Sequence, residues 1–111
     1  MYGTARQVEH ARLVADTTKA QNTDFLDADF RCTWSGSLVR VVICVDSAVV
    51  VDLVPSTGTA ISLNAGGPLS AGGLHSFEVA LDQGRTWNLQ TADASGCIVL
   101  FLAITELAVG N

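Results

Sequence analysis

The chain has 111 residues, of which 49% are hydrophobic and only 15% are charged, and its net charge is −5 at pH 7. Its single lysine and scattered arginines form no basic cluster, which excludes nucleic acid as the main partner, since nucleic-acid binding needs such a cluster. A domain of this size buries only roughly 60–70% of its unfolded surface. The composition is therefore too apolar for a small monomer and predicts contact with a membrane or with a protein partner.

Residues 1–27 predict an N-terminal arm outside the main domain. They hold seven of the 17 charged residues, and a weak helical spacing between Val8 and Ala15 allows one short helix. The alternative is a disordered tail. We favour an arm that docks on a partner, through the contact residues Tyr2, Arg6, Arg12 and Phe25.

Residues 28–111 predict one all-β domain. Short apolar or alternating runs follow one another, separated by polar or glycine-rich turns. Seven or eight strands in this length are typical of a compact antiparallel β-sandwich or jelly roll. The expected strands lie at 29–34, 38–45, 48–54, 60–64, 75–82, 87–90 and 97–107, with a short additional one at Leu69.

The longest apolar run, residues 39–54, predicts strands and no membrane span. Eight of its 16 residues are valine, whose branched side chain favours strands. Arg40, Asp46 and Asp52 interrupt the run, whereas a spanning helix needs about 20 mostly apolar residues. The first ten residues also lack the apolar core of a signal peptide. We therefore expect no membrane contact and, instead, a protein partner.

Asp46 and Ser47 divide this run and predict a tight hairpin between residues 38–45 and 48–54. One face of the hairpin should fill the core, and that face comprises Val39, Val41, Ile43, Val45, Val49, Val51 and Leu53.

The second face of the hairpin is also apolar and, with the last strand, predicts an oligomer interface. Soluble monomers rarely expose so large an apolar patch, and a closed ring of identical subunits would cover it. In the last strand, either the even-numbered residues 98–104 or the alternate Val99 and Phe101 face outward. We assign the interface to Val42, Cys44, Ala48, Val50, Ile98, Leu100 and Leu102.

Catalytic and metal-binding motifs are missing from the sequence. No serine lies in a nucleophile-elbow pattern, and the glycine pairs do not open a helix after a strand. Cys32, Cys44 and Cys97 lack the paired spacing of a zinc site, and their odd number predicts buried, reduced thiols, with one cross-strand disulfide as the alternative. We therefore expect no enzyme activity, no cofactor and no metal.

Residues 45–107 resemble small phage virion proteins. The features that carry the resemblance are a Val/Ile hairpin, "LNAGGPLSAGGLHSFEV", "DQGRTWNLQ" and a final apolar strand that ends in Glu–Leu. This stretch is similar to capsid cement or decoration proteins, which are β-sandwiches or jelly rolls that typically form trimers and carry a polar arm. The resemblance implies a homotrimer on the capsid exterior, assembled in the host cytoplasm, with the major capsid protein as partner.

Two classes of function follow. The first is a structural role, in which the protein clamps neighbouring shell subunits. The second is a receptor- or glycan-binding β-sandwich head of a phage tail or fibre. A glycan binder should expose aromatic side chains on a loop or in a groove, and Tyr2 is the only aromatic clearly outside the expected strands, unless Phe25 is a second one. We therefore favour the structural role.

Overall fold

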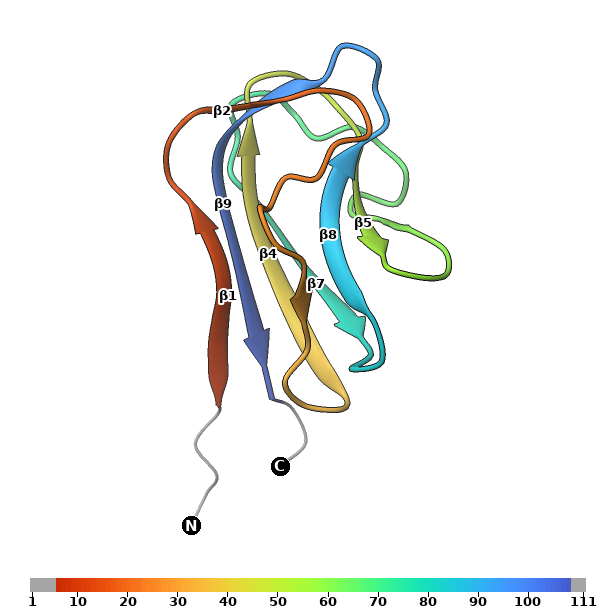
Figure 1. Ribbon diagram of the computed structural model, residues 1–111. Coiled ribbons are helices and arrows are strands. Elements are labelled where there is room, and N and C mark those ends of the chain that lie inside the picture. Colours follow the sequence, from red (N-terminus) through yellow and green to blue (C-terminus); the bar gives the residue numbers. More distant parts are fainter. Residues whose placement is uncertain (1–5, 109–111) are drawn as a thin grey trace.

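The computed structural model describes residues 6–108, which form two packed antiparallel sheets and contain no helix (Figure 1). The first sheet has five strands, in the order β1 (Gln7–Leu13), β9 (Cys97–Leu107), β4 (Ser37–Val45) and β7 (His75–Leu81), with β2 (Thr17–Lys19) also paired to β9. The second has four strands, in the order β3 (Phe30–Arg31), β8 (Thr86–Thr91), β5 (Val51–Pro55) and β6 (Ile61–Ser62). The predicted antiparallel β-sandwich is confirmed.

The strand order is that of a jelly roll. When β2 is set aside, the first strand of the chain pairs with the last, and each later connection crosses to the other sheet except the one between β5 and β6. This arrangement gives two four-stranded layers, the architecture of viral capsid and lectin domains. Because β1 and β9 pair along their length, the described part of the chain begins and ends at the same end of the sandwich.

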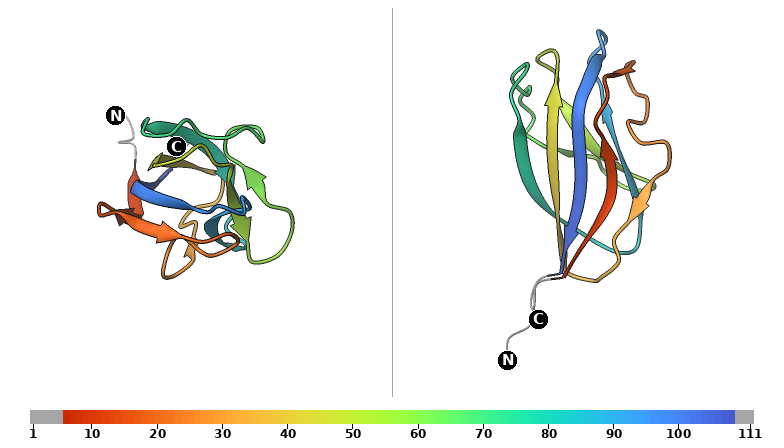
Figure 2. Two further views of the ribbon diagram at one scale, coloured as in Figure 1. Left: turned by 90° about the horizontal axis from the view of Figure 1, so that it is seen from above. Right: turned by 90° about the vertical axis from the view of Figure 1, so that its left-hand side faces the viewer.

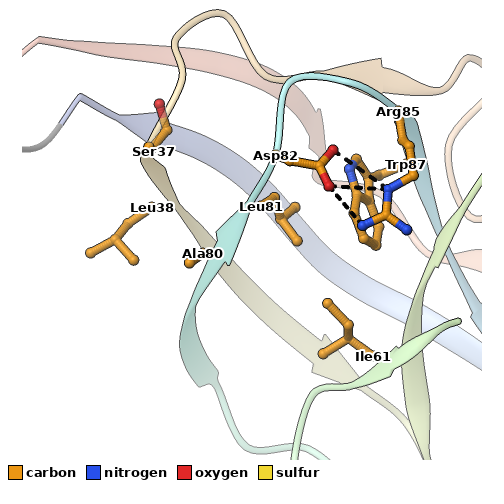
Figure 3. Close-up of a pocket in the computed structure, with 9 residues that line it drawn as sticks. Ser37, Leu38, Ile61, Ala80, Leu81, Asp82, Arg85 and Trp87 are labelled. Atoms are coloured by element: carbon orange, nitrogen blue, oxygen red, sulfur yellow. Dashed lines mark hydrogen bonds and ion pairs between the residues drawn. The ribbon is translucent and has the colours of Figure 1, made fainter. Parts of the chain in front are cut away.

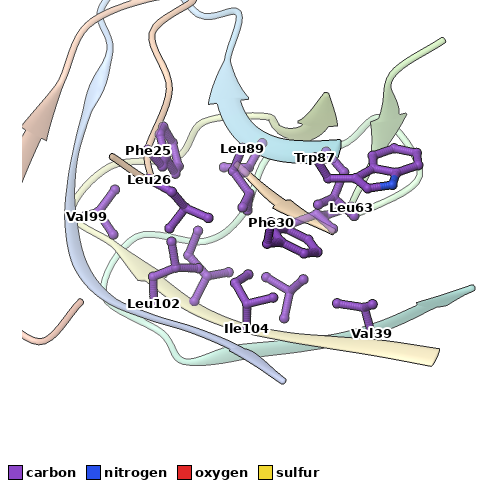
Figure 4. Packing of buried hydrophobic residues seen from close by; sticks show 14 of the residues in the cluster. Phe25, Leu26, Phe30, Val39, Leu63, Trp87, Leu89, Val99, Leu102 and Ile104 are labelled. Atoms are coloured by element: carbon purple, nitrogen blue, oxygen red, sulfur yellow. The ribbon is translucent and has the colours of Figure 1, made fainter. Parts of the chain in front are cut away.

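The core lies between the two sheets, as Figure 4 shows. The inward positions of β4 alternate with half-buried ones and are fully buried, which confirms the predicted inward face of the valine-rich run. The four-stranded sheet supplies the opposite wall with Leu53, Trp87 and Leu89, each at most 1% exposed.

The predicted hairpin between residues 38–45 and 48–54 is wrong. The strand β4 belongs to the five-stranded sheet and β5 to the other, so the connection after Asp46 crosses between the layers. The Asp46 backbone N–H donates to the Ile98 carbonyl oxygen, and the Val49 backbone pairs with Leu69. These long-range bonds use the groups that a local hairpin would need.

Residues 6–27 belong to the sandwich and form no helix, so the prediction of a separate arm with a short helix is wrong. The strand β1 pairs with β9 from Gln7 to Leu13, and β2 pairs with β9 beyond it. The next segment runs beside β8, where the Phe25 N–H donates to the Leu89 carbonyl oxygen at 2.8 Å. Phe25 is 1% exposed and is a core residue (Figure 4).

No helix within residues 6–108 is long and apolar enough to cross a membrane.

Candidate functional site

The outer face of the five-stranded sheet carries most of the residues that we assigned to an interface. The right-hand view of Figure 2 looks onto this face, with β7, β4, β9 and β1 side by side. Strand register places the outward side chains in rows that cross the sheet. These rows are Gln7–Leu107–Leu38–Ala80, Glu9–Thr105–Arg40–Glu78, Arg12–Ala103–Val42–Ser76 and, between β9 and β4, Phe101–Cys44.

An apolar row crosses the sheet at the level of Phe101 and Cys44. Val14 follows directly after β1, and Leu74 directly precedes β7, so the two residues extend the row to both edges. Val14 is 68% exposed and Leu74 is 69% exposed, and they are the large hydrophobic side chains with the highest exposure among the described residues. We call Val14, Phe101, Cys44 and Leu74 the apolar row.

Two ion pairs lie on the same face of the sheet as the apolar row. Arg40 contacts Glu78 at 2.6 Å, and Arg12 contacts Glu9 at 3.0 Å. The Arg12 guanidinium also lies 5.8 Å from the centroid of the Phe101 ring. The charges of these four side chains cancel, whereas the whole chain has a net charge of −5. The charges on this face are therefore balanced, and they lie between the apolar row and a second apolar level at Leu107 and Leu38.

Four of the assigned interface residues lie on this side of the sheet or at its bulge. Val42, Cys44, Ile98 and Leu100 are half-buried there. Leu102 is 0% exposed and points into the core, so its assignment to the interface is wrong. A β-bulge near Leu100 shifts the register between β9 and β4, and the alternation of inward and outward side chains along β9 changes at this point.

Ala48 and Val50 do not belong to this face. Both lie in the connection that carries the chain from β4 to the other sheet. Sequence reasoning assigned them to this face because it joined β4 and β5 in one hairpin. Leu74 was missed because it lies just before a strand, and Val14 was assigned to the docking arm and not to this face, although each is a large apolar residue at the end of a strand.

The assigned contact residues of the arm are not brought together. Arg12 lies on the outer face of the sheet, and Arg6 places its guanidinium 5.0 Å from the centroid of the Trp34 ring. Phe25 is buried and cannot act as an exposed anchor, so that assignment is wrong. Tyr2 lies outside the described residues.

A buried carboxylate ties the first and last strands to the loop before β4. Glu106 is 0% exposed, and its Oε1 lies 2.8 Å from His10 Nε2. The backbone N–H groups of Thr33 and Trp34 donate to the two carboxylate oxygens at 2.6 and 2.9 Å. Burial alone would raise the pKa of Glu106, but hydrogen bonds from Ser37, Thr33, Trp34 and His10 lower this pKa to about 2.

This cluster is suited to holding structure. Backbone N–H groups occupy both oxygens of Glu106, and His10 packs its ring 5.3 Å from the ring centroid of Phe30. An ionised, fully bonded carboxylate is a poor proton acceptor. We therefore assign no chemistry to the histidine–glutamate pair.

The three cysteines are free thiols. Burial raises the pKa of both Cys32 and Cys97 to about 11, so both remain protonated and unreactive at neutral pH. Cys44 lies half-buried in the apolar row. Within residues 6–108, no group of three or more histidine, cysteine, aspartate or glutamate side chains is placed to hold a metal ion.

A scan against protein-family models finds no match to the chain, and a search of curated proteins finds none either.

Proposed function

We propose that the chain is a non-enzymatic structural protein of a virion, a capsid cement or decoration protein that oligomerises and clamps neighbouring shell subunits. The observation that carries this proposal is the apolar row on the outer face of the five-stranded sheet. The jelly-roll strand order supports it, because viral capsid domains share this architecture. The partners that this role implies are copies of the chain itself and the major capsid protein, on the capsid exterior.

The distribution of charge favours a second copy of the chain as the partner that covers the outer face. The chain as a whole is acidic, so two copies repel each other over most of their surface. On this face Arg12 and Arg40 balance Glu9 and Glu78, so two copies can approach there with little repulsion. Burial of each large side chain of the apolar row contributes roughly 1.5–3 kcal/mol. A trimer is the closed ring that the resemblance to decoration proteins implies.

The alternative function is a receptor- or glycan-binding head of a tail or fibre, and the jelly roll favours it because lectin domains share that fold. A glycan platform needs exposed aromatic side chains. Among the described residues every phenylalanine and tryptophan is buried or half-buried, and Trp34 is covered on one face by Arg6. These observations favour the structural role.

Light scattering on the purified protein tests the oligomer. We expect a mass of three chains for the wild type and a smaller mass or aggregation for Val42→Glu, because an unpaired charge is intolerable in an apolar interface. Val54→Glu is the matched control, since Val54 is a half-buried valine of β5 in the opposite sheet. A monomeric wild type, or equal effects of the two substitutions, would contradict the assigned interface.

Electron microscopy of particles assembled with and without the protein tests the virion role. We expect additional density on the outer surface of the shell when the protein is present, and co-sedimentation of the oligomer with particles that lack it. Particles that neither bind the purified protein nor change on its addition would rule out the cement role. Binding to host cells or to glycans in place of particles would support the alternative function.

A further inference from the structure

The apolar row runs across the full width of the five-stranded sheet and ends in an exposed side chain at each edge. Val14 follows β1 at one edge, and Leu74 precedes β7 at the other. Both side chains are highly exposed in the single chain. A partner that covers only the centre of the face would leave them in water. A second copy placed edge to edge would instead bring Leu74 of one copy against Val14 of the next.

The second apolar level also reaches the β7 edge. Leu107 of β9 and Leu38 of β4 are neighbours on the outer face, and Ala80 continues this level onto β7. Figure 3 shows Leu38 and Ala80 on one side of the sheet and Leu81 on the other side, toward Trp87. Leu38 and Ala80 also line an open pocket of about 390 Å³ at this end of β7. Apolar side chains are therefore available at this edge at two levels of the face.

The charges between these two levels are suited to contact between the two edges. Glu9 and Arg12 form an ion pair on β1, and Glu78 on β7 pairs with Arg40. If β7 of one copy lies beside β1 of the next, each contact brings together two positive and two negative side chains. Arg12 lies one row away from the level of Glu78, a diagonal separation that long side chains can span. The contact thus carries no net charge.

The width of the sheet determines how many copies can close a ring. Strands lie about 4.8 Å apart, so β1, β9, β4 and β7 form a wall about 19 Å wide. Three such walls enclose a prism whose centre lies about 5–7 Å from each wall, close to half of the 10 Å or so that separates two packed sheets. Four walls would leave the centre about 10 Å away, roughly twice the depth that the side chains of one sheet fill. Three copies therefore give a filled interior.

We propose that three copies join edge to edge, with β7 of each beside β1 of the next, so that Leu74 packs against Val14 of the next copy. The outer faces then line the interior of the ring, and the charged side chains of β1 and β7 lie at its corners. Contacts of this kind, in which different surfaces of neighbouring copies meet, close into rings. This inference rests on the proposed function, because it takes the oligomer from there and assigns the contacts that hold it together.

Disulfide trapping in the full chain tests this arrangement. The variant carries Val14→Cys and Leu74→Cys, together with Cys44→Ala, because Cys44 is next to position 74 in the apolar row and would compete for it. Both substituted side chains are exposed, so the fold should be kept. Within one chain the two positions are three strand spacings apart, about 14 Å. Disulfides need Cα atoms within about 7 Å, so a bridge between these positions joins two copies.

We expect oxidised glutathione to convert most of this variant into a covalent species of three chains that a reductant separates again. Mass spectrometry of its peptides should show the 14–74 linkage. Val14→Cys alone and Leu74→Cys alone, each with Cys44→Ala, should remain single chains, because each position meets only the other. The matched control is Val54→Cys with Leu74→Cys, which should form no bridge because Val54 lies in the opposite sheet.

Light scattering on the same samples before oxidation separates this inference from the proposed function. A monomer would contradict both. A trimer that forms no 14–74 bridge, or whose bridges join only two chains, would leave the proposed function in place and overturn the edge-to-edge ring. Covalent species of more than three chains would overturn the closed ring as well. A bridge in either single-cysteine variant would also overturn it, since like positions meet only in a two-fold contact.

Discussion

His10 lies at a β-bulge in the first strand, and its Nε2 is 2.8 Å from Oε1 of Glu106, which is fully buried in the last strand. The bulge adds one residue to β1 opposite β9, and the histidine ring packs against Phe30. The two residues are 96 positions apart, so the contact joins the two ends of the described chain. The carboxylate also holds the loop before β4 and thereby connects three parts of the fold.

The pH dependence of stability should report on Glu106. Its pKa in the folded protein is about 2, below the ordinary value of 4.5. Because this pKa is lower in the folded protein than in the unfolded chain, the ionised carboxylate contributes its full stabilisation above pH 4.5. This contribution is lost as the pH falls toward 2. We expect urea denaturation to show a loss of about 3 kcal/mol over that range. In Glu106→Gln this part of the pH dependence should disappear, and an unchanged pH profile in that variant would contradict the assignment.

At neutral pH, Glu106→Gln should itself destabilise the protein. The amide cannot accept hydrogen bonds at both of its terminal atoms, so one backbone N–H of the loop at Thr33 and Trp34 loses its acceptor. We expect a loss of about 1–3 kcal/mol in chemical denaturation. Glu78→Gln is the matched control, because the Glu78–Arg40 pair is partly exposed and should contribute at most about 1 kcal/mol. Equal losses would show that Glu106 has no special structural role.

Residues near the N-terminus should matter to folding according to their burial. Phe25→Ala should cost about 3–5 kcal/mol, because it empties a site in the core. Arg12→Ala should cost less than about 1 kcal/mol, since its ion pair with Glu9 is exposed. Deletion of residues 2–22 should abolish cooperative unfolding, because it removes both β1 and β2 from β9. If the truncated protein still unfolds cooperatively on heating, the prediction of a separate N-terminal arm would be supported and the structural role of β1 and β2 contradicted.

Thiol labelling should separate Cys44 from the other two cysteines. Cys32 and Cys97 are buried with a raised pKa, so they should react with a thiol reagent only after unfolding. Cys44 lies in the apolar row and should be protected in the oligomer but react in Val42→Glu. Mass spectrometry after timed labelling gives the order of modification. Rapid labelling of Cys44 in the intact oligomer would place the interface elsewhere.

The sequence alone was enough to predict which side chains of an individual strand point into the core. Alternation along residues 39–45 identified Val39, Val41 and Ile43 as inward, and each is 0% exposed. The all-β class also followed from the spacing of short runs and turns. These properties are local, because successive side chains on a strand point to opposite faces whichever strand pairs with it.

Partner strands and bulges could not be predicted in this way. Asp46 follows β4 in the chain but is bonded to Ile98, so the valine-rich run divides between two sheets. Residues 7–13 read as part of an arm, yet they complete a sheet whose central strand β9 lies at the other end of the chain.

The sequence by itself determined that this protein is a β-sandwich with strands that carry apolar side chains on both faces. Tertiary structure decided where the apolar side chains outside the core lie. A one-residue bulge near Leu100 turns Leu102 inward, and the placement of β7 and β1 brings Leu74 and Val14 to the level of Cys44 and Phe101. The physical reason is that alternation is set residue by residue, whereas pairing and bulges depend on contacts between segments far apart in the chain.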